Sequence, residues 1–182
     1  GMGLSQTRGR HLNSEAVLAL VRDLNALTRF VAKPMRETGN VIGADNVLTW
    51  QTGYPFGVNL SRGFPRFNPG EFTAAEMLER GEVDAALVVG ADPLAMFSPA
   101  ARRHLAGIPT IVIDSRATET MRTATIAIRT AQYATHAPGT VYRMDDVPIP
   151  LRPALTSPRP LDVDVLIAIE RDVKQRCAVR HG

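Results

Sequence analysis

The stretch VDAALVVGADP (residues 83–93) decides the fold that this sequence predicts. Its unbroken apolar run from Ala85 to Val89 is too short for an independent helix and is rich in β-branched valine. Because the run also ends at Gly90, it predicts a strand buried on both faces. Strands of that kind belong to parallel sheets, and ligands of open α/β sheets lie beyond the carboxyl ends of the strands. Gly90 permits close approach of a ligand and Pro93 turns the chain, so we expect any binding site at this edge.

Helices and strands alternate around this stretch. A TAAE capping box at residues 73–76 opens a short helix that ends at Gly81, and Ser98-Pro99 begins a second helix. Further strands are predicted at residues 110–113 and 125–128. This alternation predicts an α/β, Rossmann-like, three-layer domain with a mainly parallel sheet flanked by helices.

Amphipathic helices are also expected near both ends of the chain. Asn13 or Ser14 is expected to cap a helix that runs to about Phe30, and Leu161-Asp162 is expected to open the last helix; both helices carry apolar residues at helical spacing. Between the last strand and the last helix, residues 139–160 are rich in proline, and a short hairpin is expected at residues 141–149.

Residues 34–70 show no clear period and are rich in glycine, proline and aromatic residues. A loop of this length inside a domain is uncommon and usually has a function or contacts another molecule. Disorder is the alternative, but disordered segments are poor in aromatic residues, whereas this one carries Trp50, Tyr54 and Phe56. We therefore expect an ordered loop that packs on a partner surface.

The composition predicts one globular domain spanning residues 1–182, with 45% hydrophobic and 21% charged residues. No apolar run approaches the roughly 20 residues that cross a membrane. The single cysteine, Cys177, excludes an internal disulfide and cysteine-clustered metal sites, and the cytoplasm is the expected compartment. The net charge of +3 is small and the arginines are scattered, so no nucleic-acid partner is expected. Gly1 precedes Met2. If Met2 is encoded by a start codon, we expect the natural chain to begin there.

Polar residues cluster at or just after the predicted strand ends. Asp92 follows the first strand, and Asp114, Ser115 and Thr118 follow the second. There a carboxylate can accept hydrogen bonds from a ribose or base, and hydroxyl groups can donate to phosphate. The same residues are also typical caps of turns and helices, and the sequence leaves the two interpretations balanced. The glycine-rich dinucleotide fingerprint is missing, so an NAD site has weak support.

No catalytic or metal-binding set is visible in the sequence. The histidines are not at metal-ligand spacing, no serine lies in a nucleophile elbow, and Cys177 is far from any histidine, which favours an idle thiol. Arg36 and Asn40 lie in PMRETGNVIGADN (residues 34–46), where glycines allow backbone amides to converge on an anion. Turn residues in a long loop are the alternative interpretation.

Several stretches are long and unusual enough to be compared with known families. They are GLSQTRGRH (3–11), PMRETGNVIGADNV (34–47), WQTGYPFGVNLSRGFPRFNPGE (50–71), GADP (90–93) and GTVYRMDDVP (139–148). Together they resemble the B subunit of formylmethanofuran dehydrogenase, a molybdopterin oxidoreductase, and the related B subunit of the bacterial formyltransferase/hydrolase complex. The similarity spans about residues 3–170 and corresponds to the C-terminal part of that protein.

The resemblance implies a molybdopterin guanine dinucleotide cofactor with Mo or W, held between several domains. Its metal ligand and iron–sulfur cysteines are implied to come from N-terminal parts that precede this sequence. No catalytic residue, no metal ligand and no cofactor bound by this chain alone are therefore expected. The residues that match cofactor-side motifs are Arg36, Asn40, Gly90, Asp92, Asp114 and Tyr142. Relatives usually have an acidic residue before Gly-Thr, whereas this chain has Pro138 before Gly139. This difference argues against a guanine or pterin contact at that position.

Two hypotheses follow from the resemblance. In the first, the chain is a truncated, non-catalytic form of this B subunit, serving as a structural or assembly component in formyl-group transfer. Its partners are then the other subunits of the complex or a second copy. In the second, it binds part of a molybdopterin or another nucleotide together with a separately encoded N-terminal half. A free-standing enzyme has the least support, because no nucleophile–base or metal set can be assembled.

Overall fold

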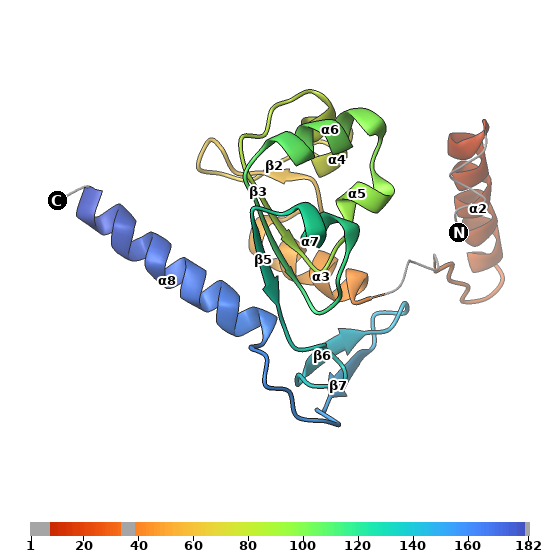
Figure 1. The fold of residues 1–182 in the computed structure, drawn as a ribbon. Coiled ribbons are helices and arrows are strands. Elements are labelled where there is room, and N and C mark those ends of the chain that lie inside the picture. Colours follow the sequence, from red (N-terminus) through yellow and green to blue (C-terminus); the bar gives the residue numbers. More distant parts are fainter. Residues whose placement is uncertain (1–7, 34–38, 181–182) are drawn as a thin grey trace.

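A three-stranded parallel sheet lies at the centre of the computed structural model, which describes residues 8–33 and 39–180 (Figure 1). Its strands follow in the order β3 (Ala86–Val89), β4 (Thr110–Asp114) and β5 (Ile126–Arg129). Both strand pairs are parallel, and helices occupy the crossovers between them. The predicted strands, and the parallel sheet flanked by helices, are confirmed.

Four helices cover one face of this sheet and form the core with it. Helix α4 (Ala74–Glu79) precedes β3, whereas α5 (Pro93–Met96), α6 (Pro99–Gly107) and α7 (Glu119–Thr123) lie in the crossovers. Val88 and Val112 pack with Met121 of α7 in one buried cluster. A second buried cluster joins Leu94 of α5 and Leu105 of α6 with Leu78 of α4, and Ala86 of β3 contacts both clusters.

The starts of α4 and α6 test two of the capping predictions. Ser98 caps α6 as expected, because its hydroxyl accepts a hydrogen bond from the Ala101 amide at 3.4 Å. Helix α4 does begin after Thr73, but the Thr73 hydroxyl makes no capping bond. The predicted capping-box hydrogen bonds are therefore wrong, although the predicted helix start is right. Thr73 Oγ1 and Glu76 Oε2 are both buried without a hydrogen-bond partner among the described residues.

The prediction that the first strand is buried on both faces is wrong. Side chains alternate between the two faces of a strand, and only the face of Val88 is covered by α4–α7. On the other face Leu87 is 50% exposed and Val89 is 40% exposed.

The predicted long loop at 34–70 is also corrected by the structure. It contains the helix α3 (Val41–Thr52) and a short antiparallel pair, β1 (Val58–Asn59) and β2 (Arg66–Phe67). Helix α3 escaped sequence analysis because its residues, VIGADNVLTWQT, do not repeat an apolar stripe at helical spacing. Gly53, whose φ of 86° is readily adopted only by glycine, ends the helix.

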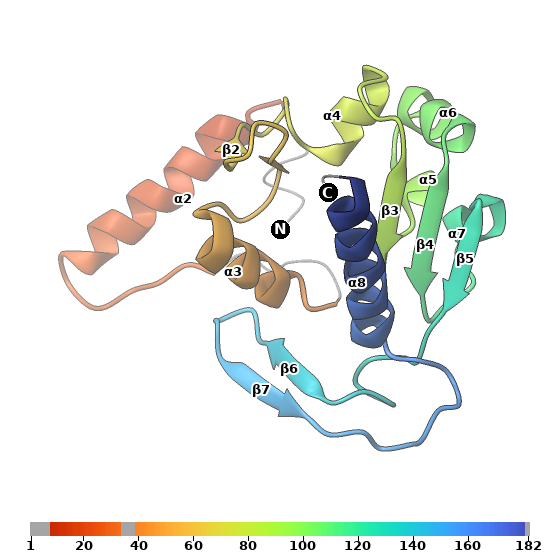
Figure 2. The same cartoon turned by 90° about the vertical axis from the view of Figure 1, so that its left-hand side faces the viewer.

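The remaining elements are a hairpin and two projecting helices. The expected hairpin is confirmed as β6 (Gly139–Tyr142) paired with β7 (Pro148–Leu151). Helices α2 (Arg10–Asn25) and α8 (Asp162–Arg180) extend away from the sheet on opposite sides (Figure 1). Turning the molecule shows α8 leaving the lower end of the sheet (Figure 2). None of the helices in the described part of the chain has the length and apolar character of a membrane span.

Candidate functional site

A cavity of about 510 Å³ opens at the carboxyl edge of the sheet. It lies between the first turn of α3, the β6–β7 hairpin and the end of β3, where the sequence predicted a site. Gly90, with a φ of 63°, has open space where a side chain would project. The other residues that line the cavity are Gly39, Asn40, Val41, Ala44, Val89, Arg116, Tyr133, Pro138, Gly139, Thr140, Val141, Leu151 and Asp162.

Asn40 fixes the wall of this cavity. Its Nδ2 donates to the Thr140 carbonyl oxygen at 2.9 Å, and its Oδ1 accepts from the Tyr142 amide at 2.9 Å. The side chain can fold back over the first turn of α3 only because position 43 is glycine: a Cβ there would lie 2.5 Å from Asn40 Nδ2 and Oδ1. Asn40 therefore uses its amide to join α3 to β6. The Tyr142 side chain does not line the cavity; its ring lies edge-on to Trp50 of α3, at 6.3 Å between centroids.

Asp92 acts as a cap for α7 and does not line this cavity. One of its oxygens accepts from the Glu119 amide at 3.0 Å, and the other accepts from the Thr120 amide at 2.9 Å and from the Thr120 hydroxyl at 2.6 Å. Partial burial raises the pKa of Asp92, but these hydrogen bonds and the charge of Arg122 together outweigh it and hold the pKa below its ordinary value. The capping interpretation is the one that the structure supports.

Asp114 is the most buried of the predicted site residues, with 3% exposure. Its Oδ1 accepts from the Arg116 amide at 2.8 Å. Its Oδ2 is buried and has no hydrogen-bond partner among the described residues. A buried carboxylate oxygen normally has a donor, so Asp114 retains the capacity to accept one more hydrogen bond.

Ser115 and Thr118 lie in the same loop after β4 and serve the backbone. The Thr118 hydroxyl caps α7 by accepting from the Met121 amide at 3.1 Å. The Ser115 carbonyl oxygen accepts from Arg129 Nη2 at 2.8 Å. Among the predicted site residues, Asn40 and Gly90 thus share the cavity, whereas Arg36 lies outside the described residues.

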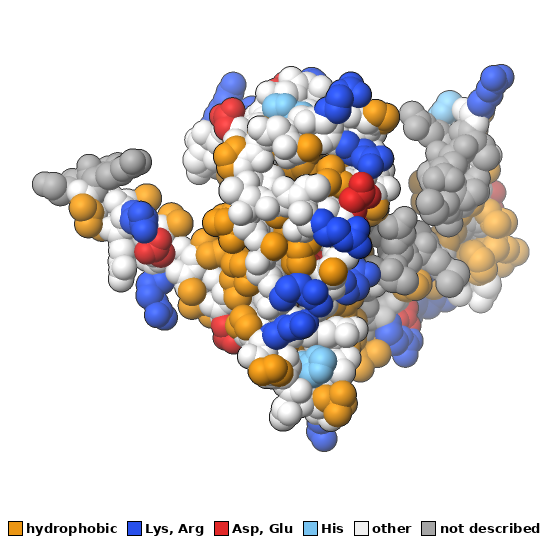
Figure 3. Space-filling model, viewed as in Figure 1, with side chains coloured by type: hydrophobic (Ala, Val, Ile, Leu, Met, Phe, Trp, Pro, Cys, Tyr) orange, Lys and Arg blue, Asp and Glu red, His pale blue; other side chains and the backbone are white. Residues whose placement is uncertain are grey.

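Sequence analysis missed Arg116 and Tyr133, which both line the cavity. Arg116 directly follows two predicted site residues, so its position after β4 was an available signal. Its side chain is 71% exposed. Arg122 and Arg129 also donate to carbonyl oxygens of the loop after β4, and positive side chains gather over α7 and the loops beside it (Figure 3). This edge therefore favours an anionic ligand.

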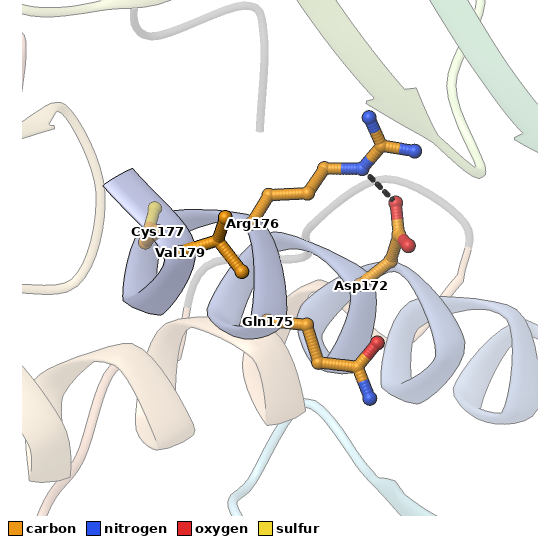
Figure 4. Close-up of a pocket in the computed structure, with 5 residues that line it drawn as sticks. All are labelled: Asp172, Gln175, Arg176, Cys177 and Val179. Atoms are coloured by element: carbon orange, nitrogen blue, oxygen red, sulfur yellow. Dashed lines mark hydrogen bonds and ion pairs between the residues drawn. The ribbon is translucent and has the colours of Figure 1, made fainter. Parts of the chain in front are cut away.

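A second cavity, of about 550 Å³, lies along the end of α8 (Figure 4). All of its described lining residues come from that one helix. Arg176 points toward Asp172 and pairs with it at 2.8 Å, while Gln175 and Val179 project elsewhere. Because an i,i+4 ion pair on an exposed helix is an ordinary surface feature, this cavity offers no convergent set of groups. The part of the chain that the structure describes also contains no cluster of His, Cys, Asp or Glu suited to a metal ion.

Comparison with known proteins gives clear similarities. No protein-family model matches the chain. It is 47% identical to the B subunit of the tungsten-containing formylmethanofuran dehydrogenase 2 of Methanocaldococcus jannaschii over 176 residues, which cover 96% of this chain and 40% of that protein. The corresponding protein of Methanococcus maripaludis is 42% identical, with 86% of this chain and 36% of that protein covered.

A bacterial protein and a solved structure extend the comparison. The B subunit of the formyltransferase/hydrolase complex Fhc of Methylorubrum extorquens is 33% identical over 82 residues, or 45% of this chain and 23% of that protein. A chain in the crystal structure of the complex FhcABCD with methylofuran, from the same organism, superimposes with a TM-score of 0.75 at 25% identity. That match covers 92% of this chain and 46% of that one. The resemblance to these B subunits is confirmed, and this chain spans about 40% of the length of the first of these relatives.

Proposed function

We propose that this chain, which is similar over nearly its whole length to part of the B subunit of formylmethanofuran dehydrogenase, is a structural component of a complex that converts formyl groups. The 47% identity over 96% of the chain carries the proposal. The use of Asp92 and Thr118 as helix caps supports a scaffolding role for those residues. The component would work in the cytoplasm, the compartment expected for a chain with a single cysteine.

Its partners would be the other subunits of such a complex. Purification of the chain from its host under gentle conditions tests this, with mass spectrometry of co-eluting proteins and analysis of molybdenum and tungsten in the same fractions. We expect stoichiometric co-elution with proteins similar to subunits of a formyltransferase/hydrolase or formylmethanofuran dehydrogenase complex. Elution of the chain by itself, at the size of one or two copies, would contradict the proposal.

A second candidate function is a module that holds the nucleotide end of a molybdopterin guanine dinucleotide or another nucleotide, together with the rest of a B subunit. The observation that favours it is the cavity at the carboxyl edge of the sheet, which Arg116 and Gly90 line. A volume of about 510 Å³ lies within the range of small-molecule sites. Such a cofactor, when bound, supplies redox chemistry at its metal. Arg116, whose side chain is exposed at the cavity, would pair with a phosphate.

Titration calorimetry with GDP tests the second function directly. A GDP affinity that falls at least tenfold in Arg116→Met, and is unchanged in Arg152→Met, would support it. Arg152 is also exposed but does not line the cavity. Absence of heat at millimolar GDP would rule out nucleotide binding by the isolated chain.

We further propose that the sheet belongs to a Rossmann-like, three-layer domain. The parallel order of β3, β4 and β5, with helices in both crossovers, supports this. A three-layer domain needs helices on the second face of the sheet as well.

A further inference from the structure

The second face of the sheet carries exposed aliphatic side chains. The exposed fractions are 50% for Leu87 on β3 and 50% for Ile126 on β5, with Val89 at 40%. Because Leu87 lies opposite Ile111 and Ile111 opposite Ile126, these side chains project from the same face. Ile113, which lies on the same face opposite Val89, is fully buried, so the uncovered part of the face is its outer strands. All-parallel sheets are normally covered by helices on both faces, so this uncovered part has the character of an interface.

The projecting helix α8 leaves Leu87, Val89 and Ile126 exposed. It starts near the end of the sheet and extends away from it (Figures 1 and 2). Leu161, Val165 and Leu166 at its start are half-buried, but every described side chain from Glu170 to Val179 is exposed. Hydrophobic side chains are exposed on the surface where the first turns of α8 leave the rest of the molecule (Figure 3).

The lengths of the relatives indicate what occupies this face. This chain covers 40% of the Methanocaldococcus jannaschii protein and 46% of the chain in the solved complex, so more than half of each lies outside the shared fold. We propose that the face of Leu87, Val89 and Ile126 is the docking surface for a helical layer belonging to that remaining part of a B subunit. This inference rests on the relationship stated under the proposed function. The face presents aliphatic side chains without charge, which suits an apolar partner.

Binding of that remaining part tests the proposal. The probe is the segment of the Methanocaldococcus jannaschii protein that lies outside the aligned region, mixed with the full chain and analysed by light scattering and calorimetry. We expect a one-to-one complex. Leu87→Glu and Ile126→Glu should each weaken it at least tenfold, because a carboxylate would be buried without a partner.

Met96 provides the matched control. It is apolar and 67% exposed, but it lies on α5, which belongs to the layer on the opposite face. Met96→Glu should change binding less than twofold, and circular dichroism should show that all three variants fold. Equal losses in Met96→Glu, or absence of a complex with the wild-type chain, would overturn the proposal. A homodimer of the wild-type chain that Leu87→Glu dissociates would assign the face to a second copy and overturn it too.

Hydrogen exchange gives an independent readout. In a fusion of the two segments, amides of residues 86–89 and 126–129 should exchange at least tenfold more slowly than in the free chain. Unchanged exchange, or a fusion that does not fold, would also count against the proposal. These outcomes are separable from the proposed function, since co-elution with other subunits can succeed when docking of this segment fails.

Discussion

Asp92 links the loop after β3 to the first turn of α7 through three hydrogen bonds. Removing a carboxylate cap typically costs about 1 kcal/mol. We expect Asp92→Ala to lower the free energy of unfolding at pH 7 by about 1–2 kcal/mol, because it also leaves the Thr120 hydroxyl without this acceptor. Denaturant unfolding measures the loss. At temperatures where the variant is folded, activity of the assembled complex should stay within tenfold of wild type, and a larger loss would indicate a direct functional role.

The same carboxylate gives the stability a defined pH dependence. Folding lowers the pKa of Asp92. The contribution of ionised Asp92 to the free energy of unfolding is therefore complete above the ordinary carboxyl pKa of about 3.9. It is lost as the pH falls through the lower pKa that Asp92 has in the folded state. We expect the gap in melting temperature between wild type and Asp92→Asn to be largest near neutral pH and to shrink below about pH 4. Asp84→Asn, which removes an exposed carboxylate before β3, is the control for the change in net charge. A gap that does not change with pH would contradict this account.

Gly43 permits the fold-back of Asn40 that joins α3 to β6. Alanine is normally favoured over glycine in a helix by up to about 1 kcal/mol. At position 43, however, its Cβ would displace the Asn40 side chain from Thr140 and Tyr142, so we expect Gly43→Ala to be net destabilising. Gly107→Ala in α6 is the matched control, because no atom of the described residues lies within 4 Å of the added Cβ. It should be neutral or stabilising in thermal unfolding.

A double-mutant cycle separates the two effects at α3. In the Asn40→Ala background the clash is gone, so Gly43→Ala should regain the ordinary helical advantage of alanine. Equal effects of Gly43→Ala with and without Asn40 would show that the two residues are not coupled.

The two capping sequences predict different outcomes for α4 and α6. The Ser98 hydroxyl accepts from the Ala101 amide and is hydrogen-bonded to Glu79, whereas the Thr73 hydroxyl is buried without a described partner. We expect Ser98→Ala to cost about 1 kcal/mol and Thr73→Val to be neutral or stabilising. Thermal unfolding of both variants measures this. A larger loss for Thr73→Val would indicate that its hydroxyl has a partner.

The elements that sequence analysis predicted are those whose signal is local. The valine-rich run before Gly90 and the Ser98-Pro99 start of α6 depend on neighbouring residues, and both are confirmed. Helix α3 was missed because its stability comes from distant contacts, such as the bonds of Asn40 to β6. The role of Asp92 was left open for the same reason, since its partners are 27 and 28 positions away in the sequence.

The molecule as a whole combines a packed body with exposed apolar surfaces. The body is the sheet with α4–α7, whereas α2 and α8 project from it (Figure 1). Leu18 on α2 and Val173 on α8 are 68% and 52% exposed. In proteins, most of the stability of a helix comes from the tertiary packing of its apolar face. These two helices are expected to gain stability when an assembly covers them, which agrees with the proposed place of this chain in a larger complex.

The distal half of α8 should therefore contribute little to the stability of the free chain. Val165 near its start is half-buried, whereas Val173 is exposed. We expect Val165→Asp to lower the melting temperature by several degrees, because it moves a charge into a partly apolar contact, and Val173→Asp to leave it within about 1–2 °C. Equal losses would show that the whole helix packs on the body in solution. In the purified complex, the same Val173→Asp change should weaken assembly if α8 is covered there, and unchanged assembly would place this helix on the outer surface.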